Sequence, residues 1–339
     1  MKESNKTPDR ADETRPANPE NGRNRVPVVW AVIGLALTIS FTWVLVQRST
    51  APAVQAVVVY CAQDQVYAEP IFADFEKTTG IKVRAVFDSE LVKTVGLANR
   101  LLAERERPQC DLFWGNEEMR TRQLAAREVF LETNGWAGFG HRSRRLVINT
   151  NLLQPASAPG SLLELTNDTW RGKVSLAYPQ FGTTATHFHA LRQLWGAEAW
   201  EAWCRALAAN KPLLMDGNMG VVRRVGKGDA WIGMTDSDDI FAGQREGLPV
   251  VGLPLGPEML LIPNTLGVIR GRPEQPERTE AVQKLFKYLQ STQVTDWLIQ
   301  AHALEGADTG PTGTLQVEWE SLLNELESTS EVLNGVFLR

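Results

Sequence analysis

Cysteine is scarce in this chain of 339 residues. The three cysteines, Cys61, Cys110 and Cys204, are odd in number, and no two lie close together in the sequence. Disulfide frameworks and zinc clusters need several cysteines at short, regular spacings. The sequence therefore argues against both.

An excess of positive charge is also absent, because the formal net charge is −5. Nucleic-acid-binding proteins normally carry a strong basic field, so we expect no nucleic-acid partner. Three catalytic signatures are missing as well: G-x-S-x-G, H-E-x-x-H and a cysteine–histidine motif. We therefore expect a chain that is not an enzyme and that has no cofactor of its own.

Tyrosine and histidine are few, with 4 tyrosines against 11 tryptophans. Low tyrosine content matters because phenolate metal sites need tyrosines. His187 and His189 are two apart on a predicted helix and so do not share a face. His141 and His302 are isolated in the sequence. We interpret all four histidines as packing or surface residues.

The N-terminal region divides into three pieces. Residues 1–25 are polar and aperiodic, which predicts a disordered cytoplasmic tail. Residues 26–46 carry no charge and as a helix would cross a hydrocarbon core about 30 Å thick. Arginines at 23 and 25 precede this run, so the positive-inside tendency places everything after the 47–56 linker outside the cytoplasm. We expect a membrane anchor, with a cleaved secretory signal as the alternative because Val54-Gln55-Ala56 resembles a cleavage site.

Strands and helices alternate after this region, which predicts a parallel α/β sheet with right-handed crossovers. Ligand groups in such sheets follow the carboxyl ends of the strands. The residues in those positions include Asp64, the 88–90 segment, Asn116 and Glu117. The predicted strands are 57–60, 81–87 and 111–114, and the predicted helices are 67–79, 91–106 and 119–127.

The stretch from Gly138 to Leu153, GFGHRSRRLVINTNLL, reads as a basic loop that enters a strand. Arg142 and Arg144 are two apart, so in extended backbone they leave on the same face and can close on one anion. A solvated basic edge is the alternative interpretation.

A second set of polar residues follows. Thr183 and Thr184 open a predicted helix, where free amides can receive an anionic oxygen, or where the threonines simply cap it. Asn218 ends a turn at 216–218. The predicted strand 230–239 ends in Asp236, Asp238 and Asp239, whose alternative role is to complement the dipole of the next helix.

A chain of this length exceeds what one hydrophobic core usually accommodates, so we predict two lobes. We expect the chain to cross from the first lobe to the second near residues 144–148 and to return near 250–255. Two lobes joined by such crossing strands form a hinged cleft. We predict a two-lobed α/β fold in a monomer. Lobe 1 comprises 57–143 plus 254–300, lobe 2 comprises 144–253, and 301–339 forms a C-terminal helical segment with a helix at 317–326.

From residue 57 to about 301 the sequence resembles the periplasmic solute-binding proteins of ABC importers, specifically the ferric-ion-binding group of extracellular solute-binding family 1. This resemblance implies two lobes that close over one small solute and then dock to a permease with its ATPase, with no chemistry on the solute. The matching segments are VVVYCAQDQVYAEPIFADFEKTTGIKV, CDLFWGNEE, GFGHRSRRLVINT, FGTTATH, DGNMGVVRRVGKGDAWIGMTDSDD and IPNTLGVIRGRPEQPERTEAVQKLFKYL.

The resemblance also implies site residues. Asp64 stands at the family's histidine position, and Asn116 or Glu117 stands at its glutamate position. Arg142 and Arg144 match the family's anion-holding loop closely. Where the family has two adjacent tyrosines, this chain has Thr235 and Asp236, and only Tyr67 among its tyrosines is expected to face the cleft.

Two kinds of solute remain open at this point. Fe(III) or another metal ion can be held by Asp64, Glu117 and Asp236, with an anion on the arginines. Alternatively, an anionic or zwitterionic molecule such as phosphate or a phosphonate binds the arginines and the Thr183 and Thr184 amides. A membrane-anchored sensor with the same cleft is a further alternative to an importer subunit.

Overall fold

The computed structural model describes residues 56–87, 93–132, 135–272, 275–307 and 312–338. The predicted tail 1–25, the apolar segment 26–46, most of the linker and the 88–90 segment lie outside these ranges. No helix within them is long and apolar enough to cross a membrane. The anchor at 26–46 therefore stays a prediction.

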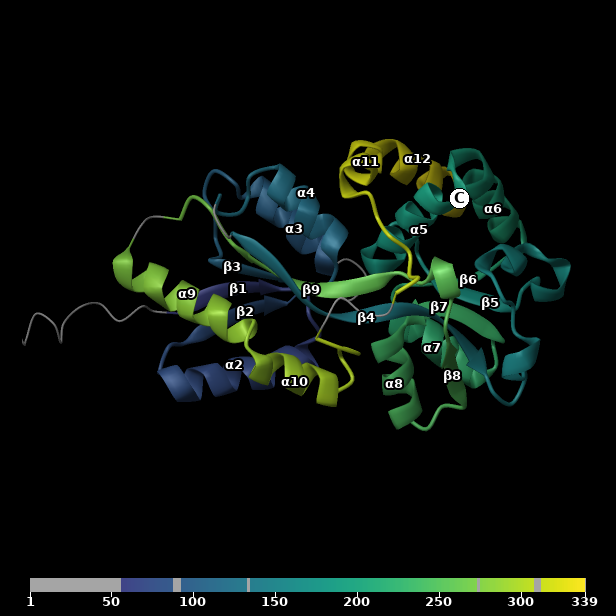
Figure 1. Cartoon of the computed structure of the whole chain (residues 1–339), viewed down its shortest axis with the longest axis horizontal. Helices are drawn as coiled ribbons and strands as arrows, with labels where there is room; N and C mark the ends of the chain where they lie inside the picture. The colour runs from purple at the N-terminus through teal and green to yellow at the C-terminus, as the bar shows by residue number, and fades with distance from the viewer. Residues whose placement is uncertain (1–55, 88–92, 133–134, 273–274, 308–311, 339) are drawn as a thin grey trace, which may run out of the picture. The chain divides into compact units, whose positions relative to one another are not determined.

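The described strands form one mixed sheet in the order β2-β1-β3-β9-β4-β7-β5-β6, with β8 paired to β4 (Figure 1). The predicted parallel pairing is correct for β1 with β2 and β3, and β5 is parallel to β6 and β7. The returning strand β9 is antiparallel to β3 and β4, and β4 is antiparallel to β7 and β8. The strands are β1 (Val57–Cys61), β2 (Val83–Phe87), β3 (Leu112–Gly115), β4 (Trp136–Asn149), β5 (Val174–Ala177), β6 (Leu213–Met215), β7 (Ile232–Asp236), β8 (Val250–Leu253) and β9 (Leu261–Val268).

Helices cover both faces of the sheet, as Figure 1 shows. The helix that follows β1 illustrates how the sequence places them, because its apolar residues recur at helical spacing and it ends at Gly80, whose φ of 73° favours glycine. The helices are α2 (Gln65–Thr79), α3 (Lys93–Ala103), α4 (Glu118–Ala126), α5 (Gly182–Trp195), α6 (Ala197–Ala209), α7 (Asn218–Lys227), α8 (Ser237–Arg245), α9 (Pro276–Leu289), α10 (Thr292–Gln300), α11 (Trp319–Asn324) and α12 (Leu326–Phe337), with short 3-10 turns η1 (Pro155–Ser157), η2 (Leu162–Thr166), η3 (Asp168–Trp170) and η4 (Gly256–Glu258).

Strand β4 is the element that joins the two halves of the sheet. Its first part pairs with β9, and its second part pairs with β7 and β8. The predicted basic loop around Arg142 is therefore wrong, because these residues are extended and paired. The register shifts between Phe139 and Arg142, and Gly140 has a φ of 55° there, so a bulge redirects the strand without breaking it.

The apolar core falls into two main parts. One part packs α2, α9 and α10 against one face of the β1 to β3 region and α3 and α4 against the other. The second part packs α5, α6 and α12 against one face of the β4 to β7 region and α7 and α8 against the other. Leu255 and Ile262, which follow β8, and Phe337 of α12 all pack in the second part of the core. The residue limits given above for the two lobes stay a prediction.

The C-terminal segment forms two helices where the sequence predicted one at 317–326. The helix breaks at Glu325, and a second helix continues to Phe337. Met119 of α4, Ala185 of α5 and Leu322 of α11 share a small apolar cluster. The C-terminal helices therefore contact elements that follow β3 as well as elements that follow β5.

Candidate functional site

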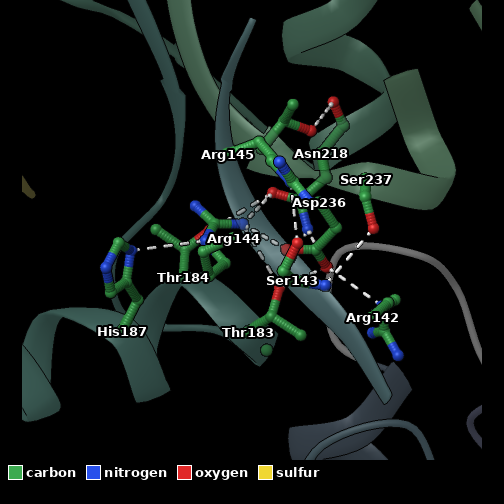
Figure 2. Close-up of polar contacts among 12 residues, drawn as sticks. Arg142, Ser143, Arg144, Arg145, Thr183, Thr184, His187, Asn218, Asp236 and Ser237 are labelled. Carbon is green, nitrogen blue, oxygen red and sulfur yellow. Dashed lines mark hydrogen bonds and ion pairs between the residues drawn. The ribbon is translucent and has the colours of Figure 1, made fainter. Parts of the chain in front are cut away.

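A buried ion pair links the two strands at the centre of the sheet. Arg144 of β4 lies directly opposite Asp236 of β7 in the antiparallel register. The Arg144 Nη1 to Asp236 Oδ1 distance is 2.6 Å, and the two side chains are 0% and 2% exposed (Figure 2). Facing residues of an antiparallel pair project to the same side of the sheet, so the pairing itself delivers the guanidinium to the carboxylate.

Arg142 approaches the same carboxylate from two residues earlier on β4. Its Nε lies 3.5 Å from Asp236 Oδ2 and 3.4 Å from Asp238 Oδ1. Its Nη2 donates a hydrogen bond of 2.9 Å to the carbonyl oxygen of Asn116, just after β3. The two arginines thus converge on Asp236, a carboxylate of the chain itself, and Arg142 also ties β4 to the end of β3.

Side chains from α5 and α7 complete this polar cluster. Thr183 donates to Asp236 Oδ2 at 2.8 Å, and Asn218 Nδ2 donates to the same oxygen at 3.1 Å. Asn218 Oδ1 accepts from Arg144 Nη1 at 3.0 Å and from the Thr184 hydroxyl at 3.3 Å. Neither threonine caps α5, because its N-cap is Phe181. Asp236 is the N-cap of α8 by position, but its side chain makes no capping bond.

His187 belongs to the cluster, whereas its place in the sequence predicts only a packing or surface role. Its Nδ1 accepts from Arg144 Nε at 3.4 Å, and its Nε2 lies 2.7 Å from the carbonyl oxygen of Glu258. The carbonyl requires a proton on Nε2 and leaves Nδ1 as the acceptor. Burial, together with the charge of Arg144, lowers the His187 pKa to about 3, so the ring is neutral. The informative spacing is the four residues from Thr183, which place both side chains on one face of α5.

The two buried carboxyl groups of the cluster, Asp236 and Asp238, differ in pKa. Burial alone would raise the pKa of Asp236, but Arg144 and Arg142 hold it below its ordinary value. Burial raises the pKa of Asp238 to about 7, and the charges of Asp236 and Asp64 contribute to that rise. At neutral pH the buried cluster therefore contains two guanidinium cations, the ionised carboxylate of Asp236 and the partly protonated carboxyl group of Asp238.

Several buried polar atoms of the cluster lack a hydrogen-bond partner among the residues that the structure describes. Arg142 Nη1 and Arg144 Nη2 have none, whereas Arg142 Nε and Asp238 Oδ1 make no hydrogen bond but lie 3.4 Å apart as an ion pair. Leaving a buried donor unsatisfied costs about 1–3 kcal/mol, and more when the group is charged. Two guanidinium nitrogens, Arg142 Nη1 and Arg144 Nη2, are thus able to donate to an anionic ligand, and a solute oxygen that reached them would recover that cost.

Of the acidic residues predicted as metal ligands, Asp236 belongs to a compact acidic group. Asp236, Asp238 and Asp239 have ligand oxygens within 4.8 Å of one another, and in the described part of the chain this is the acidic group compact enough for a metal ion. Asp64 is partly buried and lies close enough to raise the pKa of Asp238. Glu117 is fully buried, and its role as a metal ligand stays a prediction, as does that of Asp64.

Glu117 connects two helices. It is the N-cap of α4, where its side chain accepts from the Arg120 amide at 3.0 Å. Its second oxygen accepts from the Thr186 hydroxyl of α5 at 2.8 Å. Burial raises its pKa. A carboxylate in this position holds the start of α4 against α5, beside the Asn116 carbonyl that Arg142 contacts.

Tyrosine is peripheral to the cluster. Tyr67 accepts a hydrogen bond of 3.2 Å from Arg245, and its pKa is raised by burial and then by the charge of Asp238. Its phenol therefore lies near the acidic side of the cluster. The position that carries a tyrosine pair in the resembling proteins holds Thr235, whose hydroxyl donates to the Asn218 carbonyl, and Asp236.

Most of the chain matches the model of a known protein family. The model of the family described as bacterial extracellular solute-binding protein matches residues 57–302. The chain belongs to this family. Its members bind solutes rather than transform them, so the predictions of a solute-binding protein and of no enzymatic activity are confirmed, as is the resemblance to the ferric-binding group.

Individual relatives agree with this assignment. The "Fe(3+)-binding periplasmic protein" of Serratia marcescens is 28% identical over 212 residues, which are 57% of this chain and 60% of that protein. The chain thus matches less than two thirds of the length of this relative. Iron-bound HitA from Pseudomonas aeruginosa superposes with a TM-score of 0.71 at 18% identity, covering 82% of this chain and 99% of HitA.

A neighbour with a different bound molecule has the same fold. AfuA from Actinobacillus pleuropneumoniae, with fructose-6-phosphate bound, gives a TM-score of 0.68 at 15% identity and covers 84% of this chain and 98% of AfuA. These likenesses confirm the predicted two-lobed periplasmic-binding fold.

Proposed function

We propose that this chain is the solute-binding component of an ABC import system. It captures a small solute on the periplasmic or extracytoplasmic side and delivers it to a membrane permease that works with an ATPase. Membership of the solute-binding family and the periplasmic relative support this role.

The observation that carries the proposal is the group of unsatisfied guanidinium nitrogens on Arg142 and Arg144. Buried charge-assisted donors of this kind bind carboxylate and phosphate oxygens strongly. In our account an oxyanion of the solute, or one that accompanies it, binds at these two arginines. Thr183 and Asn218 fix the geometry by holding Asp236, which in turn holds Arg144.

Fe(III) or another hard metal ion, carried with an anion, is the first candidate solute. The Serratia relative is named for Fe(3+), and the oxygen-rich group of Asp236, Asp238 and Asp239 lies beside the arginines. Carboxylate oxygens suit hard cations. An anion on the arginines would offset part of the charge that such an ion brings into a buried site.

An anionic or zwitterionic organic molecule, such as a phosphate ester or phosphonate, is the second candidate. The specific observation in its favour is that Asp236 is already bound by Arg144 and approached by Arg142, so two cations compete with a metal ion for it. No tyrosine oxygen enters the hydrogen bonds of the cluster in the described structure. The AfuA structure shows that this fold accommodates a sugar phosphate in another protein.

Isothermal titration calorimetry tests the proposal directly. The probes are Fe(III) with phosphate, phosphate alone and fructose 6-phosphate, each titrated into the wild type and the Arg142→Gln variant. At least one probe should bind the wild type and lose about tenfold or more in the variant, because one charge-assisted hydrogen bond contributes about 1.5–3 kcal/mol.

Arg145→Gln is the matched control. Arg145 neighbours the cluster in sequence but bonds to Ser143 and Glu305 instead. Its substitution should leave the affinity unchanged. Equal affinities in the wild type and the Arg142→Gln variant for every probe that binds would contradict the assignment of the site.

A further inference from the structure

A cavity of about 620 Å³ lies between α4 and the C-terminal helices α11 and α12. It shares no lining residue with the polar cluster around Arg144. One wall is formed by α4 and the other by α11 and α12, and the lining residues are Arg120, Gln123, Ala126, Arg127, Leu323, Asn324, Leu326, Glu327 and Ser330.

The positive charge of Arg120, which lines this cavity, is only partly offset by neighbouring groups. Its Nε is buried and has no hydrogen-bond partner within the described ranges. Its Nη1 donates to Gln123 Oε1 at 3.0 Å, which is a neutral acceptor. Burial lowers the pKa of Arg120, and the charge of Glu117 offsets only part of that effect. A half-buried guanidinium in this condition is stabilised by any anion that reaches it.

The surroundings of Arg120 are also short of negative charge. His189 is buried and neutral, because burial and the nearby charges of Arg120 and Arg192 lower its pKa to about 3. Arg192 is paired with Glu325. Arg127 lines the cavity at an exposed position, and Glu327, also exposed, is the one carboxylate that lines it.

We propose that this cavity binds a small oxyanion of the phosphate class, with Arg120 as its principal ligand. The side chains of Asn324 and Ser330 supply polar groups on the opposite wall. This site goes beyond the solute site of the proposed function and does not depend on it. Because the anion would touch both α4 and α12, it would also stabilise the packing of the C-terminal helices against α4.

Calorimetric titration of inorganic phosphate into the full chain tests the site in the Arg142→Gln background, where the central cluster is disabled. We expect binding of phosphate in that background and a loss of about tenfold or more on adding Arg120→Gln. A second variant, Ala126→Glu, places a carboxylate at an exposed lining position and should weaken phosphate similarly by repulsion.

Arg205→Gln serves as the control, since Arg205 is an exposed arginine of α6 whose partner is Glu201. It should leave phosphate binding unchanged. Phosphate affinity that stays the same in both Arg120→Gln and Ala126→Glu, or an absence of phosphate binding in the Arg142→Gln background, would overturn the proposal. The solute cluster is judged separately, by comparing the affinity of each probe in the wild type with that in Arg142→Gln.

Discussion

Arg144 and Asp236 form a buried ion pair of 2.6 Å between residues that face each other across β4 and β7. The same carboxylate receives Thr183 and Asn218 and lies 3.5 Å from Arg142. The Asp236 carboxylate is therefore the anion that lies between the two guanidinium groups. This relationship determines how the cluster responds to substitution and to a solute.

Removal of one partner of this pair should be costly. The Asp236→Ala variant leaves Arg144 buried without its counter-charge, which typically destabilises a protein by about 3–5 kcal/mol. Urea unfolding monitored by tryptophan fluorescence measures the change. The Arg144→Met/Asp236→Leu double variant should recover much of the loss, since no isolated charge remains. A loss below about 1 kcal/mol in the single variant would show that the pair is not buried in solution.

Asp236→Asn distinguishes the two candidate solutes by the sign of its effect. If the solute is an organic anion, the substitution removes a competing negative charge and should raise affinity several-fold. If the solute is a metal ion held partly by Asp236, the loss of a carboxylate ligand should lower affinity by at least tenfold. Calorimetry with fructose 6-phosphate and with Fe(III) plus phosphate measures both. Unchanged affinity for each probe that binds would contradict both roles of Asp236.

His187 should position Arg144 rather than merely fill space. His187→Phe removes the acceptor for Arg144 Nε and leaves the Glu258 carbonyl without its partner. We expect a stability loss of about 1–3 kcal/mol and weaker solute binding. His187→Gln, which keeps polar atoms, should retain more of the affinity. His189→Phe is the matched control on the same buried helix, and an equal loss of affinity in that variant would count against a positioning role.

Asp238 should make stability fall as pH rises towards neutrality. Its pKa is raised from 3.8 to about 7 in the folded chain. The folded state thus keeps a proton that the unfolded state releases near pH 4, so between about pH 4 and 7 ionisation favours unfolding. The destabilisation therefore accumulates between these pH values and persists above pH 7.

Unfolding free energies measured from pH 4 to 8 test this pH dependence. Asp238→Asn should remove the decline and be more stable than the wild type at pH 8. The exposed Asp229→Asn serves as control. Parallel pH profiles for wild type and Asp238→Asn would exclude a protonated Asp238 in the folded state.

The C-terminal helices should depend on a contact between α11 and α4. The Arg122 guanidinium lies 4.8 Å from the Trp319 ring centre and 5.2 Å from that of Trp136. Trp319→Ala removes one cation–π contact and part of the apolar cluster, so we expect a loss of about 1–3 kcal/mol. Hydrogen exchange should rise first in α11 and α12. Exchange that rises equally in β1 and β3 would indicate global destabilisation instead.

Local patterns were sufficient to predict the alternating part of the fold. Val57 to Cys61 is apolar throughout and forms a strand buried on both faces. The helix after it ends at Gly80, as the glycine indicates. The length of β4 was not predictable in this way, since the glycines and arginines before Leu146 are typical of a loop. Pairing with β9, which lies more than a hundred residues later in the chain, keeps that segment extended.

The candidate site shows the same division between local and long-range information. The spacing of Arg142 and Arg144 predicted that both can reach one anion, and in the structure both approach the Asp236 carboxylate. The sequence did not identify Asp236 as that anion, because the two residues of the pair are 92 positions apart and only strand register brings them together. Glu117 accepts a hydrogen bond from Thr186 through a helix contact that no local pattern encodes, and its predicted role as a metal ligand stays a prediction.

The most direct measurement is native mass spectrometry, with elemental analysis, of the chain purified from the periplasm of a bacterial host without added solute. The account predicts that the wild type retains a small molecule with an anionic group, with or without a metal, and that Arg142→Gln loses it while Arg145→Gln keeps it. Retention of the same molecule by Arg142→Gln, or a bound solute with no anionic group, would contradict the central role of the two arginines.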